Sequence, residues 1–315
     1  MHFFPDAAPV QESTYSTPDI YTLPLNNVYF CPRYNLLHTR SRQIIKESIS
    51  TRTDLAQLSL SAFYRNSIHN FDEPCSLFRS HHNPYYHTLI DNLPRLYLLH
   101  HPRFREIDDI KLLCADQLTN IEEYFLHKLL PDNVSPVVLD KNKLYRLENL
   151  IFPSFLSRRF SGYLPTEYRR WFVERVAPKR SRQKNKRIFI SRIATKKGPQ
   201  RCILNEDELF QGLRPYGFER YVLEELSTEE QIALFYDAEA VVAAHGAGLT
   251  NTIFSSEIKV IELFPAPFVL PHFYFLAKSL GHSYQYWCAD RKDRHDNFSV
   301  DVSAVLNLVE MAEKS

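Results

Sequence analysis

The chain has 315 residues, of which 44% are hydrophobic and 24% charged, so it is an ordinary globular protein long enough for two modest domains. Its formal net charge of +1 provides no global field that would attract nucleic acid or an anionic membrane. No apolar run reaches the length of about 18 residues that a transmembrane helix needs, and the N-terminus does not resemble a signal peptide. The five cysteines show no metal-ligand spacing, so we expect reduced thiols.

The first half of the chain shows strands and helices in alternation. Residues 1–25 are expected to form a loose arm, and residues 28–45 a strand and a turn. The stretch from Tyr85 to His100 has apolar residues at helical spacing, although Pro94 must kink or restart that helix. Strands are expected at 110–114, 135–139 and 149–152, and a helix at 121–130. This alternation predicts an α/β layer.

The second half is more regular. A helix over 166–178 is followed by a basic run, 179–187, which we interpret as a solvated linker. Strands are then expected at 187–192, 221–223, 240–244 and 259–264. Helices are expected after the N-cap Asn205, at 228–236 behind a Ser227–Glu230 capping box, at 248–254, at 271–280 before Gly281, and at 301–314. The repeated strand–helix pattern predicts a parallel, doubly wound sheet.

A glycine-containing turn is the sharpest local motif. In AVVAAHGAGLTN, residues 240–251, a buried strand runs into His245, Gly246, Ala247 and Gly248 and then into a helix that includes Asn251. Glycines let a backbone approach a ligand closely, and a helix N-terminus offers free N–H groups to a phosphate. A purely structural tight turn is the alternative interpretation.

Other polar residues end neighbouring strands. Ser191 and Arg192 end the strand at 187–192, and Arg201 follows on the next loop. If that strand and the strand at 240–244 share a sheet, both loops open on the same edge, and the arginines could hold a diphosphate. Glu262 ends an apolar strand, where it could bind a ribose diol or form a buried salt bridge.

A His–Asp pair is the candidate for proton transfer. His87 and Asp91 are four residues apart, so they share one face of the expected helix and could act together as a general base. Metal binding by His81, His82 and His87 is one alternative, and simple packing at the start of the helix is another.

Several of these segments together resemble glycosyltransferase family 61. They are NPYYHTLIDNLPRL at 83–96, ISRIATKKGPQR at 190–201, LNEDEL at 204–209, LSTEEQIALFYDAEAVVAAHGAGLTNTIF at 226–254 and VIELF at 260–264. The chain departs from the family at Ala244, where a proline often precedes the histidine. The resemblance covers residues 83–96 and most of 187–287.

The resemblance implies an α/β, GT-B-like fold of two Rossmann-like domains with a ligand cleft between them. We place the domains at 1–178 on the acceptor side and 179–290 for the nucleotide sugar, with 291–315 a helix that can cross back to the first domain. By motif, the donor would be bound by Ser191, Arg192, Arg201, Asn205, Glu206, His245, Gly246, Ala247, Gly248, Asn251 and Glu262. The catalytic residues would be Asp91 and His87.

The implied activity is an inverting, metal-independent sugar transfer from a nucleotide donor, expected to be a UDP-sugar. The acceptor would be a hydroxyl of a saccharide or a lipid-linked precursor of a surface polysaccharide. No cofactor and no nucleic-acid partner are expected. The resemblance implies a bacterial, cytoplasmic member with at most peripheral membrane contact. The alternative is a non-catalytic protein that binds nucleotide sugars as the partner of a polysaccharide synthase.

Overall fold

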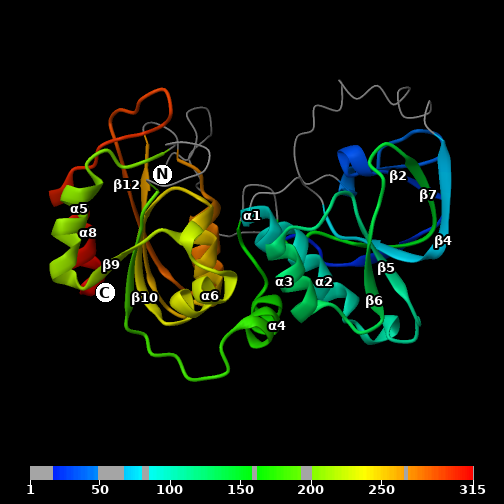
Figure 1. Cartoon of the computed structure of the whole chain (residues 1–315), viewed down its shortest axis with the longest axis horizontal. Coiled ribbons are helices and arrows are strands. Elements are labelled where there is room, and N and C mark those ends of the chain that lie inside the picture. Colours follow the sequence, from blue (N-terminus) through cyan, green and yellow to red (C-terminus); the bar gives the residue numbers. More distant parts are fainter. Residues whose placement is uncertain are drawn as a thin grey trace. The chain divides into compact units, whose positions relative to one another are not determined.

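The computed structural model describes residues 17–48, 67–79, 85–157, 162–192, 201–265 and 269–314 (Figure 1). Contacts divide the chain into two compact parts, an N-terminal unit, Thr17–Arg159, and a C-terminal unit that includes Phe160–Ser315. Both units are α/β, as the sequence predicts. The helix expected at 166–178 is α4 (Thr166–Val176), and it belongs to the C-terminal unit, where its Phe172 stacks on Phe254. Within the described segments, no helix is long and apolar enough to cross a bilayer.

The N-terminal unit contains a mixed seven-stranded sheet in the order β3-β2-β7-β4-β5-β6, with β1 also paired to β7. Its strands are β1 (Thr22–Leu25), β2 (Val28–Cys31), β3 (Leu36–His38), β4 (Ile68–Leu77), β5 (Ile110–Cys114), β6 (Val134–Val138) and β7 (Leu144–Pro153). Strands β7, β4, β5 and β6 are parallel, whereas β1, β2 and β3 add antiparallel pairings. The sheet of this unit therefore has a parallel part with an antiparallel edge.

The helices of this unit are short. They are α1 (Tyr85–His87), the π-helix η5 (Thr88–Asn92), α2 (Leu93–Leu99) and α3 (Asn120–Leu129), with 3-10 turns η1 (Pro32–Tyr34), η2 (Lys46–Ser48) and η6 (Pro102–Phe104). Helix α3 begins with a capping box, because the Thr119 side chain accepts from the backbone of Glu122 while the Glu122 carboxylate accepts from the backbone of Thr119.

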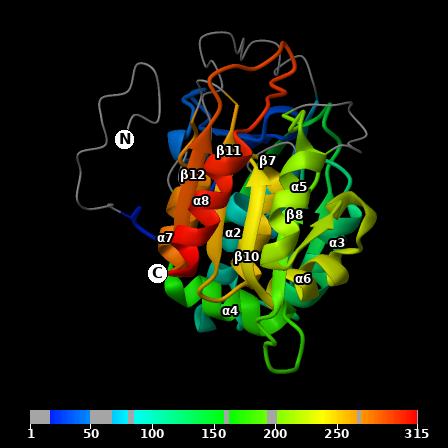
Figure 2. The ribbon, with the colours of Figure 1, turned by 90° about the vertical axis from the view of Figure 1, so that its left-hand side faces the viewer.

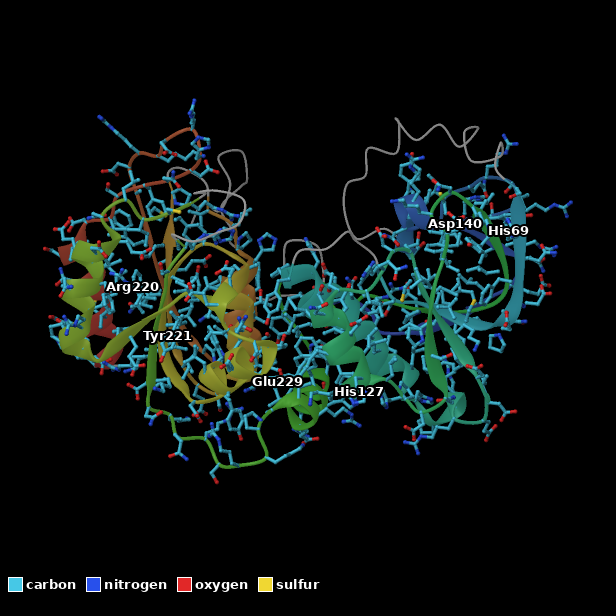
Figure 3. All side chains as sticks on the ribbon, viewed as in Figure 1. His69, His127, Asp140, Arg220, Tyr221 and Glu229 are labelled. Carbon is cyan, nitrogen blue, oxygen red and sulfur yellow. The ribbon has the colours of Figure 1, made fainter. Side chains whose placement is uncertain are left out.

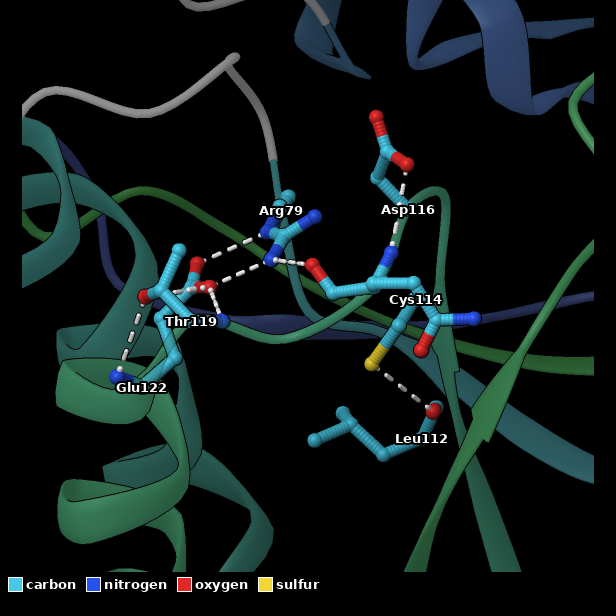
Figure 4. A network of polar contacts seen from close by, with 7 residues as sticks. Arg79, Leu112, Cys114, Asp116, Thr119 and Glu122 are labelled. Carbon is cyan, nitrogen blue, oxygen red and sulfur yellow. Dashed lines mark hydrogen bonds and ion pairs between the residues drawn. The ribbon is translucent and has the colours of Figure 1, made fainter.

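A buried ion pair joins the end of β4 to the start of α3 (Figure 4). Arg79, which follows β4, donates from Nε to Oε1 of Glu122 at 2.7 Å and from Nη2 to Oε2 and to the carbonyl oxygen of Gln117. Glu122 is fully buried and also accepts from the Thr119 hydroxyl. Each of the two buried charges has several hydrogen-bond partners, and the pair links the segment after β4 to the first turn of α3.

The C-terminal unit has a five-stranded sheet in the order β12-β11-β10-β8-β9, and all of its strand pairs are parallel. The strands are β8 (Lys186–Ile190), β9 (Phe218–Tyr221), β10 (Ala238–Ala244), β11 (Lys259–Phe264) and β12 (Ser283–Cys288). The helices are α4, α5 (Glu206–Leu213), α6 (Thr228–Tyr236), α7 (His272–Leu280) and α8 (Val302–Glu313), with 3-10 helices η7 (Arg214–Tyr216), η8 (Leu223–Glu225) and η9 (Ala247–Phe254). This confirms the predicted doubly wound parallel sheet.

Helices cover both faces of this sheet. Figures 1 and 2 show α5 and α8 together on one face, where Leu209, Leu213, Val305 and Val309 join a core with β-strand residues such as Val242. Helices α6 and α7 pack with η9 on the other face. The terminal helix α8, expected to begin near residue 301, thus buries its apolar side against α5 and β11 of its own unit.

Local sequence signals set several boundaries of this unit. Ser227 and Glu230 form the predicted capping box at the start of α6. Gly281 ends α7 in the left-handed conformation, with φ of 70°, as expected of a C-terminal glycine. The basic run before β8 is more structural than the solvated linker that we expected. Arg182 donates to the carbonyl oxygens of Tyr236 and Phe254, and Arg180 pairs with Asp237.

Candidate active site

Two loops of the C-terminal unit leave the sheet side by side. Strands β8 and β10 are parallel neighbours, with Ile190 opposite Ala243, so the loop at Ser191 and the turn at His245 emerge from adjacent strands. This confirms the predicted shared edge. The chain passes from β8 to β9 on one side and then returns to β10 on the other, so β8 and β10 flank the point where the strand order reverses. Ligands of open α/β sheets bind at such a point.

Arg192 lies directly against the glycine turn. Its Nη1 donates to the carbonyl oxygen of His245 at 3.4 Å. A Cβ atom added to Gly246 would lie 1.8 Å from the same Nη1, so the missing side chain leaves space for the guanidinium. Burial, followed by the nearby charge of Arg201, lowers the pKa of Arg192. Two neighbouring guanidinium groups repel each other, and an anion between them would relieve that repulsion.

The segment that carries Arg201 and Asn205 is held by backbone hydrogen bonds. Arg201 adopts a left-handed conformation, with φ of 57°, and its N–H donates to the carbonyl oxygen of His295 at 3.2 Å. Asn205 is the N-cap residue of α5, as predicted, but its side chain does not accept a hydrogen bond from the first turn of that helix. It binds the segment before α8 instead. Its Oδ1 accepts from the backbone of Val300 at 2.9 Å, and its Nδ2 donates to the Val300 oxygen and to Glu208.

Ser191 and Glu206 form a buried pair beneath Arg192. The Ser191 hydroxyl donates to Oε1 of Glu206 at 2.7 Å, and the Ser191 N–H donates to Tyr221. Arg220, labelled on β9 in Figure 3, has its Nη1 3.8 Å from the same carboxylate oxygen. Burial nevertheless raises the pKa of Glu206, although Ser191 and Arg220 act in the opposite direction. The pair therefore ties the first residue after β8 to the first residue of α5.

His245 is held by a chain of buried hydrogen bonds. Its Nδ1 lies 2.5 Å from Oε1 of Glu262, and because a carboxylate accepts, we assign the hydrogen to Nδ1. The other Glu262 oxygen accepts from the Tyr284 hydroxyl at 2.6 Å. The imidazole also stacks on Phe264, with ring centroids 5.1 Å apart. The ring orientation is therefore fixed, and Nε2 is the nitrogen left for a ligand.

Glu262 has no exposed surface, and both of its oxygens already accept hydrogen bonds. A ribose diol, one of the two partners that the sequence allowed for this residue, could reach the carboxylate only if the side chains that cover it moved. The burial of Tyr284 and the charge of Glu262 raise the pKa of the tyrosine well above its usual range, so the hydroxyl stays a donor.

The turn after His245 continues as the 3-10 helix η9, where the sequence predicts a helix. The first N–H groups of a helix have no partner within it, and here they belong to Ala247 and Gly248. A Cβ atom on Gly248 would lie 2.9 Å from Leu223, so the turn packs closely on η8. The buried Asn251 donates to the Gly248 oxygen at 3.2 Å and to Gln231. Asn251 thereby fixes the backbone of the turn.

His87 and Asp91 lie in the N-terminal unit, on the helical stretch that follows β4. The His87 Nδ1 contacts Oδ2 of Asp91, as the spacing of four residues predicts. Their side chains are 28% and 16% exposed, so both reach solvent. His81 and His82, the other members of the metal alternative, lie outside the described residues.

A π turn places this pair. The Leu93 N–H donates to the Thr88 oxygen five residues earlier, so the helix is widened before Pro94. Proline lacks an N–H, and its ring clashes with the preceding turn of a regular helix, which explains the widening. Arg95 is fully buried, donates twice to the Pro153 oxygen and has a pKa lowered by burial to about 9, with Asp91 opposing that shift.

The structure thus groups the predicted residues into two sets. The donor residues that we predicted all belong to the C-terminal unit, and His87 and Asp91 belong to the N-terminal unit. Sequence analysis missed Tyr284 and Arg220. A signal for Tyr284 existed in the alternation of Tyr284, Tyr286 and Cys288, which is typical of a strand, next to the strand that carries the lone Glu262.

Comparison with known proteins agrees with the family resemblance. Residues 85–261, more than half of the chain, match the family described as Glycosyltransferase 61. The chain is also 27% identical over 99 residues to the Beta-1,2-xylosyltransferase of Arabidopsis thaliana. That alignment covers 27% of this chain and 18% of the plant protein, so the chain spans less than a fifth of that relative's length. The matched segment contains Asp91, Arg192 and the His245 turn, and the chain therefore belongs to glycosyltransferase family 61.

Proposed function

We propose that this glycosyltransferase takes its sugar from a nucleotide donor, whose diphosphate binds between Arg192, Arg201 and the N-terminus of η9. The contact of Arg192 with the His245–Gly246 turn carries this proposal, because it joins a guanidinium and a helix N-terminus at the point where the strand order reverses. Fixed positive groups stabilise the charge that develops on a departing diphosphate. UDP is the proposed nucleotide, and because the plant relative is named a xylosyltransferase, UDP-xylose is the first donor to test.

The donor residues act in three ways in this proposal. Arg192, Arg201 and the N–H groups of Ala247 and Gly248 bind phosphate oxygens. His245 presents Nε2 to the donor, in the orientation that Glu262 fixes. The remaining residues do not touch the donor but hold these groups in place through hydrogen bonds. They are Ser191, Asn205, Glu206, Asn251 and Glu262.

The proposed reaction is an inverting transfer. Asp91, with His87 hydrogen-bonded to it, takes the proton from an acceptor hydroxyl, whose oxygen forms a bond to the anomeric carbon. The bond from that carbon to the diphosphate oxygen breaks on the opposite face, and UDP leaves. Because arginines supply the positive charge, we propose that the reaction needs no divalent metal. In this GT-B-like scheme the unit with Asp91 activates the reacting hydroxyl of the acceptor, which is a saccharide or a lipid-linked precursor of a surface polysaccharide.

The test is UDP release from UDP-xylose, UDP-arabinose and UDP-N-acetylglucosamine, with and without EDTA. We expect release from at least one donor, unchanged by EDTA, and a loss of at least about a hundredfold in the Asp91→Asn variant, the scale of a general base. Full activity of Asp91→Asn would remove Asp91 as the base. Binding of UDP without turnover of any donor would favour a non-catalytic partner protein.

A further inference from the structure

A cavity of about 620 Å³ lies in the C-terminal unit, at the carboxyl end of β12 and the N-terminal end of α8. We call it the Trp287 cavity. Its lining includes Leu204, Trp287, Asp290, Asp293, Asn297 and Asp301. The volume is in the range of small-ligand sites, which is about 300–1,000 Å³.

The wall of the Trp287 cavity is held in place by its own polar groups. Asp293 accepts from the backbone of His295 at 2.7 Å, from the backbone of Asn297 at 2.8 Å and from the Asn297 amide at 2.9 Å. Asn297 is 5% exposed, and its Oδ1 accepts from the backbone of Cys202 at 2.9 Å. A wall fixed in this way can bind a ligand without being ordered first.

The chemistry of the cavity suits a neutral, hydroxylated ring. Trp287 is partly buried and packs against the core, while Leu204 beside it is 64% exposed. A sugar ring offers C–H groups to such an apolar surface and hydroxyl donors to carboxylates such as Asp290 and Asp301. The lining has three carboxylates and two cations, and one cation, Lys292, already pairs with Asp296. This balance does not favour a phosphate.

The segment 201–205 links the Trp287 cavity to the proposed donor site. Its partner is the loop at 290–301, which lines the cavity. Arg201 is hydrogen-bonded to His295, Leu204 to Phe298 and Asn205 to Val300. The cavity also opens at the edge of the sheet where the His245 turn lies, because all five strands are parallel. One strand separates β12 from β10, a distance of about 10 Å between the two. An acceptor that fills the cavity and reaches the donor must therefore be longer than one sugar ring.

We propose that the Trp287 cavity binds a sugar residue of an oligosaccharide acceptor, stacked on Trp287, apart from the nucleotide. This inference rests on the proposed function, since it assigns the acceptor class of the same enzyme. It makes Trp287 a binding residue that neither the sequence motifs nor the donor geometry indicate.

Fluorescence of the full chain tests the proposal, because Trp171 and Trp287 are its two tryptophans. Trp171 is 8% exposed, and a Trp171→Phe variant would leave the emission of Trp287 alone. We expect a saturable change in this emission with xylotriose or chitotriose, and none with inorganic phosphate. Calorimetry on the Trp287→Ala variant should show trisaccharide binding weakened about tenfold, the scale of one aromatic contact. Met311→Ala, on the exposed side of α8, is the control and should bind like the wild type.

Unchanged trisaccharide affinity in Trp287→Ala, or no binding of either trisaccharide to the wild type, would overturn the proposal. Calorimetry does not depend on the Trp171 variant, so the test stands if that variant fails to fold. Titration with UDP separates a failure of the proposed acceptor site from a failure of the proposed donor site. UDP binding without trisaccharide binding overturns the acceptor site alone, whereas trisaccharide binding without UDP binding overturns the donor site.

Discussion

His282 is a buried histidine that the structure holds neutral. Its Nε2 donates to the Thr252 oxygen at 3.0 Å, and its Nδ1 accepts from the Ile258 N–H at 3.5 Å, so a second proton would displace a donor. Burial lowers the pKa of His282 from 6.5 to about 4, and Arg169 and Arg182 act in the same direction. The unfolded chain therefore takes up a proton near pH 6.5 that the folded protein accepts only near pH 4.

This difference predicts that the protein loses stability as the pH falls from 6.5 towards 4. Between pH 7.5 and 5 we expect this residue to lower the free energy of unfolding by about 2 kcal/mol. Urea denaturation of the wild type and of His282→Asn at both pH values measures the effect. The variant should lose about 2 kcal/mol less than the wild type over that interval. Equal losses in the two proteins would show that His282 does not carry the dependence.

Tyr284 is expected to act by positioning His245 through Glu262. Removing its hydroxyl leaves one oxygen of a fully buried carboxylate without its donor, which costs about 1–3 kcal/mol. We predict that Tyr284→Phe lowers the free energy of unfolding by that amount and reduces kcat for UDP release about tenfold, while KM for the acceptor is unchanged.

Tyr286→Phe is the matched control for this prediction, because Tyr286 lies on the same strand and forms a T-shaped ring contact with Phe264, whereas the Glu262 oxygens accept from His245 and Tyr284. It should retain wild-type stability and kcat. Equal behaviour of the two variants, in urea denaturation and in turnover, would contradict a specific role of the Tyr284 hydroxyl.

At the scale of elements, the turn between β10 and η9 depends on glycine for space rather than for backbone conformation. Gly246 has extended backbone, with φ of 173°, but a Cβ atom there would occupy the place of the Arg192 guanidinium. Because Nη1 is the end of a flexible side chain, the arginine can move aside without unfolding the unit. Gly246→Ala should therefore weaken UDP binding about tenfold or more, the scale of one charge-assisted hydrogen bond, with little change in Tm.

Gly281→Ala is the opposite control. An added Cβ there meets nothing within 4 Å, but φ is +70°, so this substitution strains the end of α7. It should lower the free energy of unfolding by about 1 kcal/mol and leave UDP affinity unchanged. Calorimetry and thermal denaturation of both variants measure the two effects. A Gly246→Ala protein that binds UDP like the wild type would show that UDP binding does not depend on the position of the Arg192 guanidinium beside Gly246.

The elements of the C-terminal unit were more predictable than those of the N-terminal unit, for physical reasons. Strands such as β10 and β11 are buried on both faces and read as continuous apolar runs between capping signals such as Ser227. Strand β4 was missed because most of it, the segment IHNFDEP, is largely exposed and polar, with a register shift before Pro74. The π turn at Thr88–Asn92 could not be foreseen either, because Pro94 indicates a disturbance but not its form.

The sequence predicted which strand ends meet at the candidate site better than it predicted the contacts made there. The shared edge of the β8 and β10 loops followed from the strand–helix alternation, and the structure confirms it. The chain from Tyr284 through Glu262 to His245 could not be predicted, because it depends on the register between β11 and β12. Asn205 was correctly placed at a helix start, but its bonds to Val300 join segments about a hundred residues apart.

For the whole molecule, a net charge of +1 means that affinity for an anionic donor must come from local groups rather than from a global field. Each unit has its own hydrophobic core, one around Phe152 and Leu147 and the other around Phe189 and Val242. The proposed donor residues all belong to the second of these units. Donor binding should therefore depend on a few charges at the carboxyl edge of one parallel sheet.

The most direct measurement is the affinity for UDP, by calorimetry, of the wild type and of an Arg192→Ala, Arg201→Ala double variant. Each lost charge-assisted hydrogen bond costs about 1.5–3 kcal/mol, so we predict that UDP binding weakens about a hundredfold or more. Circular dichroism should show that the variant keeps its fold, because both side chains lie on loops outside the core of the sheet. A double variant that binds UDP as tightly as the wild type would contradict the placement of the diphosphate between these loops.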